Sequence, residues 1–201
     1  MSKQLPKSFN DLTIEEFQAA SLYLDRLRHP LTPEEKTDVW IDVLSFFTGK
    51  TQEYYETLPF DKLNPLIAKC KFLTNPNDIT EVNETVIINN QFYKGLTDMT
   101  KGSYAQFASI KTILSHDQSA QSYHKLLGCI YAPIKLYGKE YDMLEVQEQM
   151  KQAKVGQVLG LVFFYSKVFN RLTSVINDYM KIAEVSLQNS EKNLETSTAG
   201  T

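Results

Sequence analysis

Apolar residues recur every three or four positions along most of the chain, which is the spacing of a helix that buries one face. The first such stretch begins at Thr13, and Glu16 follows three residues later. The threonine hydroxyl can accept from the amide of residue 16 while the Glu16 carboxylate reaches back, which is a capping box. We therefore expect a helix from Thr13 to about Arg28, ended by Pro30.

The second periodic stretch has the clearest boundaries in the chain. Thr32 precedes a proline at the first helical position, Glu35 completes a capping box, and Gly49 suits the left-handed conformation that ends many helices. The apolar positions of this stretch surround Trp40, the one tryptophan in the sequence. The pattern predicts a helix from about residue 33 to residue 48 with Trp40 in the core.

The same periodicity predicts helices along the rest of the chain, with turns between them. Thr100 is expected to cap one of them, and the longest apolar seam predicts a helix of about thirty residues that begins near Val155. The expected ranges are 52–57, 61–73, 100–114, 121–131, 144–152 and 155–182.

One segment has the pattern of strands instead. Residues 85–88 and 91–94 are rich in β-branched and aromatic side chains, and they flank Asn89-Asn90. Asparagine tolerates the positive φ that a two-residue hairpin turn requires. We expect one hairpin here, and because an isolated hairpin is marginal in water it must pack on helices or pair its edge with another chain.

These elements predict a mainly α fold, like a helical bundle in two parts with one β-hairpin. The first part is an N-terminal helical unit over residues 1–78, and the second is a hairpin-led helical unit over residues 79–187 with a long C-terminal helix. Residues 188–201 consist largely of Ser, Thr, Glu and Asn, so we expect them to be disordered.

The net charge and the length of the longest apolar block limit which kinds of partner the protein can bind. The 201 residues carry a formal net charge of -3, which provides none of the positive field that sequence-independent phosphate binding needs. The longest apolar block, residues 158–165, is far shorter than the roughly 20 residues of a membrane span. We expect neither a nucleic acid nor a membrane partner, and the absence of a secretion signal at the N-terminus favours a reducing compartment.

Candidate chemistry is sparse. The histidines His29, His116 and His124 are not spaced as metal ligands, and Cys70 and Cys129 read as buried thiols. A Cys129 nucleophile with His116 or His124 as its base is conceivable in space, but burial would make that thiol inert. We expect no metal, no cofactor and no catalytic residue, and hence a protein that is not an enzyme.

Other groups that could carry chemistry have structural explanations. The acidic pairs at residues 15–16 and 34–35 occupy first helical turns, where the helix dipole favours negative charge. The segment from Gly156 to Gly160 lacks the strand and the Lys-Ser/Thr of a phosphate loop, so it indicates close helix packing. Lys151, Lys154, Lys167 and Arg171 read as a solvated face of the last helices.

Aromatic residues are the abundant feature, with 11 Phe and 11 Tyr. Most should lie in the core, but those on short or edge elements cannot bury both sides of their rings. Exposed tyrosines are typical of protein interfaces. The candidate protein-binding residues are Tyr54, Tyr55, Phe92 and Tyr93.

Several motifs follow one another in a specific order. Residues 44–59 contain Thr48-Gly49, a short helix and Leu58-Pro59, and a helix over 61–73 follows. The hairpin then leads into residues 96–107 with their Met-Thr-Lys-Gly-Ser-Tyr run, and residues 124–134, 141–142 and 161–165 continue the pattern. The order of these motifs resembles tail assembly chaperones of long-tailed bacteriophages, and the hairpin-led part is similar to the entry of related phage proteins. The resemblance covers about residues 10 to 170.

The resemblance implies a small helical protein that acts in virion morphogenesis without chemistry of its own. In that family the chaperone coats the long helical tape-measure protein in the host cell cytoplasm until tail-tube subunits displace it. The alternative is a structural component of the virion, such as a ring, connector or baseplate subunit, with the hairpin edge used for self-association. An enzyme would require an acid, base or nucleophile that no local motif supplies.

Overall fold

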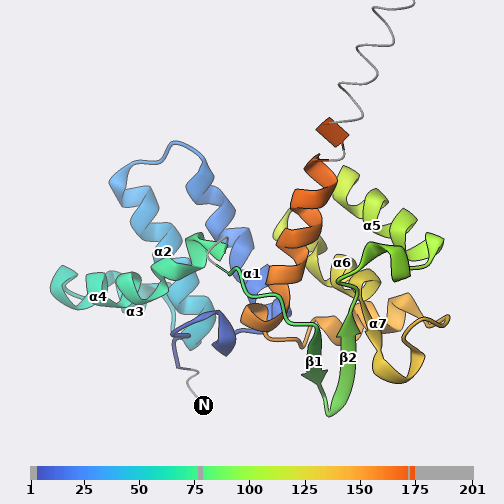
Figure 1. Cartoon of the computed structure of the whole chain (residues 1–201). Coiled ribbons are helices and arrows are strands. Elements are labelled where there is room, and N and C mark those ends of the chain that lie inside the picture. The colour runs from blue at the N-terminus through green and yellow to red at the C-terminus, as the bar shows by residue number, and fades with distance from the viewer. Residues whose placement is uncertain (1–3, 77–78, 172, 175–201) are drawn as a thin grey trace, which may run out of the picture. The chain divides into compact units, whose positions relative to one another are not determined.

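A computed structural model describes residues 4–76, 79–171 and 173–174. The fold is mainly helical, as predicted, and contains one small antiparallel sheet (Figure 1). The α-helices are α1 (Ile14–Leu24), α2 (Pro33–Thr48), α3 (Gln52–Glu56), α4 (Phe60–Cys70), α5 (Tyr104–His116), α6 (Tyr123–Ile130) and α7 (Met143–Met150), followed by a helix over 155–171. The strands are β1 (Thr85–Ile88), β2 (Gln91–Gly95) and β3 (Tyr131–Pro133).

Helices α1 and α2 begin where local signals predict, and α2 also ends where they predict. The hydroxyls of Thr13 and Thr32 accept from the amides of Glu16 and Glu35, at 3.2 Å in each case, and both capping boxes are closed by the glutamates. Helix α2 ends at Gly49, whose φ of 72° is in the left-handed region. These predictions are confirmed. The predicted end of the first helix at about Arg28 differs, because α1 ends at Leu24 and the chain continues as a 3-10 turn, η2 (Asp25–Arg28).

The core between these helices forms around the apolar stripe of α2. Trp40 is buried with 9% of its surface exposed, which confirms its predicted place in the core. Helix α2 packs against α1, α3 and α4. The buried residues of α1 and α2 include Ile14, Phe17, Leu24, Val39, Val43, Leu44 and Phe47.

The predicted hairpin is present, with Asn89 and Asn90 at φ values of 49° and 62°. It is not a lone hairpin, however, because β3 pairs antiparallel with β2 and makes a sheet of order β1-β2-β3. The sequence predicted that residues 121–131 form one helix, but helix α6 stops at Ile130. Pro133 pushes the residue before it toward extended conformations, so the chain leaves the helix as a strand.

The start of α5 also differs from the prediction. Thr100 is not its cap, since the Thr100 hydroxyl donates to the Asp98 carboxylate at 2.7 Å. Ser103 caps the helix instead, and Gln106 completes the capping box. Two candidate caps lie three residues apart here, and only the second is followed at the third position by a side chain that can reach back.

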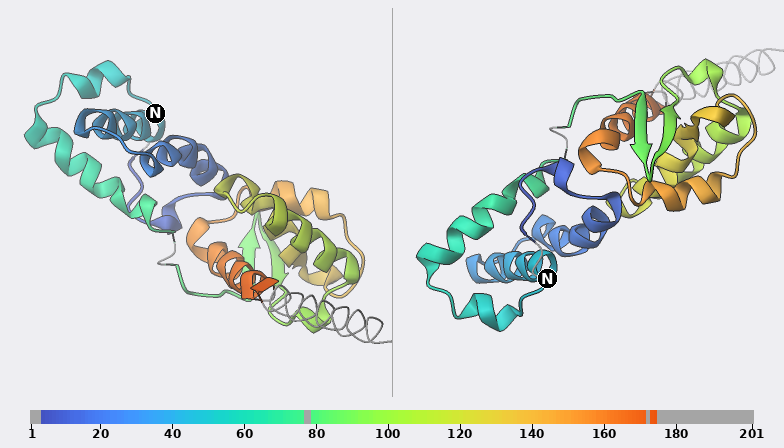
Figure 2. Two further views of the ribbon diagram at one scale, coloured as in Figure 1. Left: turned by 90° about the horizontal axis from the view of Figure 1, so that it is seen from above. Right: turned by 90° about the horizontal axis from the view of Figure 1, so that it is seen from below.

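Glycines allow three segments to approach closely in the second half of the fold. A Cβ built on Gly160 would overlap the carbonyl oxygen of Glu81, and one on Gly156 would overlap the side chain of Asn10. A Cβ on Gly128 would meet the backbone of Gln147. The predicted close packing of the 156–160 segment is therefore confirmed. Figure 2 shows the beginning of its helix and the hairpin in two further views.

Contacts between Cα atoms divide the chain into two units, residues 1–164 and residues 165–201. The predicted boundary at residue 78 falls on residues 77–78, outside the described residues, and stays a prediction. The predicted helix to residue 182 is present as far as the structure describes it. The predicted disorder of residues 188–201 concerns residues outside that range.

Candidate protein-binding surface

The sheet has two chemically different faces because side chains alternate along each strand. Val86, Ile88 and Tyr93 point to the buried face, where each is at most 4% exposed. Ile87 and Phe92 point the other way and are directly opposite each other across β1 and β2. They are 57% and 50% exposed, so two large apolar side chains sit together on the open face.

A cavity of about 530 Å³ lies beside this pair. The turn after β3, η7 (Ile134–Leu136), forms its other wall, and Ile134 and Leu136 are 48% and 39% exposed. The residues that line the cavity are Asn90, Gln91, Phe92, Pro133, Ile134, Lys135 and Leu136. We call Ile87, Phe92, Ile134 and Leu136 the outer sheet surface.

Positive charge borders the outer sheet surface. Lys135 lines the cavity, and the Lys94 ammonium lies 4.8 Å from the centre of the Tyr137 ring. The described residues that line this cavity include no acidic side chain. An apolar segment with an acidic residue beside it would therefore be complementary to this surface in both shape and charge.

Of the four predicted binding residues, the sheet contributes Phe92 and Tyr93 on opposite faces. Phe92 is part of the outer sheet surface, whereas Tyr93 is 1% exposed and belongs to the core. Period-2 alternation could have separated these two neighbours in the sequence. Ile134 and Leu136 were missed because they follow β3, which looked like the end of a helix.

The other two predicted residues lie on α3, where they also differ. Tyr55 is 2% exposed, and its hydroxyl is 2.7 Å from the hydroxyl of Thr48, which donates to Leu44. Tyr54 is 42% exposed, and the Lys50 ammonium covers its ring at 3.8 Å. Tyr54 and Phe92 are thus the exposed members of the predicted set, and they have different neighbours.

The two cysteines are free and buried, as predicted. Burial raises the pKa of both thiols to about 11, which disfavours the thiolate at neutral pH. Cys129 lies at a cavity of about 340 Å³ whose described lining contains Ser109, Lys125 and Gln147 but no histidine. His124, the nearest candidate base in sequence, is engaged elsewhere.

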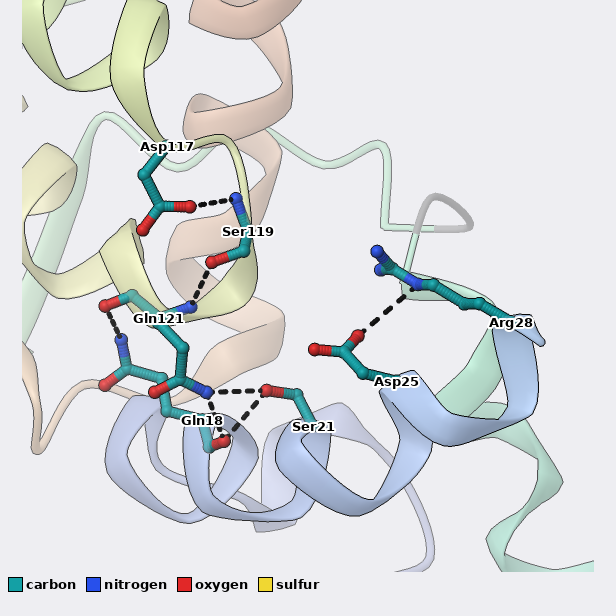
Figure 3. A network of polar contacts seen from close by, with 7 residues as sticks. All are labelled: Gln18, Ser21, Asp25, Arg28, Asp117, Ser119 and Gln121. Carbon is teal, nitrogen blue, oxygen red and sulfur yellow. Dashed lines mark hydrogen bonds and ion pairs between the residues drawn. The ribbon is translucent and has the colours of Figure 1, made fainter.

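A polar network joins α1 to η6 (Ala120–Ser122), as Figure 3 shows for Gln18, Ser21 and Gln121, and it also reaches His124 on α6. The Gln18 amide nitrogen is 2.9 Å from the carbonyl oxygens of Ala120 and Gln121 and 2.8 Å from Nδ1 of His124. In return the Gln121 side-chain amide donates to the Gln18 carbonyl and to the Ser21 hydroxyl. His124 is therefore held within the fold through this contact of its Nδ1 with Gln18.

A third cavity, of about 520 Å³, lies between the start of α5 and the segment before α7. Two of its polar side chains, Gln106 and Tyr141, form hydrogen bonds that hold the fold. The Gln106 amide donates to the Tyr141 hydroxyl oxygen and to the Cys129 carbonyl, and the Tyr141 hydroxyl donates to the Gly128 carbonyl at 3.2 Å. Burial raises the pKa of Tyr141 to about 12, so it remains a neutral donor.

Comparison of the chain with protein-family models, with curated proteins and with solved structures finds no match. Among the described residues there is no group of three or more His, Cys, Asp or Glu side chains that could hold a metal ion. A search of the same residues also finds no helix both long and apolar enough to cross a membrane.

Proposed function

We propose that the protein works by binding another protein, as a non-enzymatic tail assembly chaperone of a long-tailed bacteriophage. Its client would be the tape-measure protein, whose long amphipathic helix must be kept soluble in the host cytoplasm before the tail assembles. The observation that supports a binding role is the outer sheet surface. It leaves large apolar side chains exposed beside a cavity, and proteins expose such patches chiefly where they bind a partner.

The surface favours a client segment of a particular kind. An apolar residue of the client would enter the cavity between Phe92 and Leu136, while an acidic residue one turn away would approach Lys135. An amphipathic helix presents both at a spacing of three or four residues. Repeated binding along one long client would add avidity to a weak single contact.

Coexpression with the tape-measure protein encoded by the same phage tests this proposal. We expect the client to be soluble with the wild-type chain and to precipitate with the Phe92→Ala variant. The matched control is Phe60→Ala, because Phe60 is also exposed, at 72%, but lies at the start of α4. If the client is equally soluble with and without the wild-type chain, the chaperone role is wrong.

The second candidate function is a structural component of the virion, such as a ring, connector or baseplate subunit. The open backbone edge of β1 favours it, because subunits of a particle can join through sheet edges. Mass spectrometry of purified virions separates the two functions. Abundance in the particle supports the subunit, whereas presence in infected cells alone supports the chaperone.

A further inference from the structure

The backbone of β1 has unused hydrogen-bonding groups on its outer side. The amide of Gly95 donates to the Glu84 carbonyl, which makes these two residues a hydrogen-bonded pair of the antiparallel ladder. Such pairs alternate along the ladder, so Val86 and Ile88 also bond to β2. The N–H and C=O groups of Thr85 and Ile87 therefore point away from β2, and among the described residues they have no partner.

The sequence of β1 does nothing to protect this edge. Natural edge strands are usually guarded by a lysine, a proline, a bulge or a covering element. Strand β1 is Thr-Val-Ile-Ile, and its two outward residues have exposed side chains. The nearest charge on its N-terminal side is Glu84, which is outside the strand.

We propose that β1 pairs antiparallel with β1 of a second copy of this chain across a two-fold axis at Val86. Thr85 of each copy then lies opposite Ile87 of the other, and both of these pairs exchange their N–H and C=O groups. The two unpaired positions are separated by one residue, so the edge is complementary to itself, as an isologous interface requires. An extended segment of a different protein would need no such symmetry.

The pairing also brings the open faces of the two sheets, which carry exposed apolar side chains, side by side. Because the register preserves the alternation of side chains, Ile87 of both copies falls on the same face of the joined sheet. Glu84 lies opposite Ile88 of the second copy, so no like charges meet across the axis. The strand is short, and the pairing is therefore weak and depends on protein concentration. This inference does not rest on the proposed function, since it concerns the chain alone.

Sedimentation velocity of the full chain tests the inference over about a hundred-fold range of concentration. We expect a reversible monomer–dimer equilibrium for the wild type and for Ile87→Thr, which keeps the amide. Ile87→Pro removes the outward N–H without touching the bonds to β2, as edge prolines do. It should weaken dimerisation at least about ten-fold, since each copy loses a hydrogen bond and the ring obstructs the approach.

Amide hydrogen exchange tests the same geometry without any substitution, and so remains decisive if Ile87→Pro fails to fold. The amides of Thr85 and Ile87 should exchange more slowly as concentration rises, while that of Leu96, which donates to Ile130 within the fold, should not change. A chain that is monomeric at every concentration overturns the inference. A dimer in which these two amides stay unprotected also overturns it.

Discussion

Two regions of the molecule differ in how far apart in sequence their deciding contacts are. The local region is helices α1 to α4, and the sheet region is the part of the chain from β1 onward. In α1 and α2 each boundary depends on residues within four positions, such as Thr32 with Glu35 or Gly49 with Ser45. In the sheet region the deciding contacts join distant residues, such as Gly95 with Tyr131 or Gly160 with Glu81. The local region could therefore be predicted in detail, whereas the sheet region could be predicted only in part.

Removal of the central side chain of the local region should have the largest effect. Trp40→Ala should lower the free energy of unfolding by about 3 to 5 kcal/mol, the usual loss for a large buried aromatic. Urea denaturation followed by far-ultraviolet circular dichroism measures it. Phe60→Ala is the control and should change stability little, because that ring is 72% exposed. A loss below about 1 kcal/mol for Trp40→Ala would contradict its place in the core.

Alanine substitutions at two glycines, one in each region, allow the cost in stability to be compared directly. Gly160→Ala should cost about 3 kcal/mol, because the new methyl group meets the backbone of Glu81, which cannot rotate away. Gly49→Ala should cost only about 1 kcal/mol, because nothing lies within 4 Å and the penalty is the left-handed backbone alone.

Asparagine distinguishes the two causes, since it tolerates the left-handed region but is larger than alanine. Gly49→Asn should be more stable than Gly49→Ala, whereas Gly160→Asn should be less stable than Gly160→Ala. The measurement is the urea midpoint of each variant. If alanine is more stable than asparagine at both positions, the left-handed backbone is not the cause at Gly49. If asparagine is more stable at both, contact with Glu81 is not the cause at Gly160.

The polar network that links α1 to α6 contains His124, and it should make the stability of the protein depend on pH. The pKa of His124 is lowered, chiefly by burial and then by Lys151 and Lys125. The folded state therefore binds fewer protons than the unfolded state below the ordinary pKa of about 6.5. Stability from this group is complete above that pH and is lost as the pH falls toward the lowered pKa.

Protonation would also place an N–H of His124 against the Gln18 amide, which already donates to two carbonyl oxygens. We expect His124→Gln to flatten the dependence of unfolding free energy on pH below about pH 6.5, where the unfolded chain binds a proton at His124 more readily than the folded chain. Urea unfolding at several pH values measures this dependence. His116→Gln is the control, and an equal change in that variant would exclude the network as the cause.

The smallest effect concerns the cap of α5. Ser103→Ala should cost about 1 kcal/mol, because the amide of Gln106 loses its acceptor. Thr100→Ala should cost less, since Thr100 bonds only within an exposed turn. Thermal unfolding of the two variants decides between them, and a larger loss for Thr100→Ala would restore the cap that the sequence first suggested.

The residues of the candidate surface could likewise be predicted only where local patterns place them. Phe92 could be placed on a hairpin, and strand alternation separates it from buried Tyr93. Ile134 and Leu136, which complete the outer sheet surface, could not be found, because their position depends on β3 pairing with β2. Tyr55 was expected at a surface, but Thr48 lies close enough to satisfy its hydroxyl in the core.

The sequence by itself determined the helical class, the start of α1, both boundaries of α2, the hairpin turn and the burial of both thiols. Each follows from capping, periodicity or φ preference within a few residues. Tertiary structure alone decided that β3 pairs with β2, which glycines meet another backbone, and that Ile134 and Leu136 lie beside Phe92. These outcomes depend on pairings such as Gly95 with Tyr131. The two residues are far apart in sequence, so no local pattern signals the pairing, and its hydrogen bonds stabilise the fold only after the loop between them has closed.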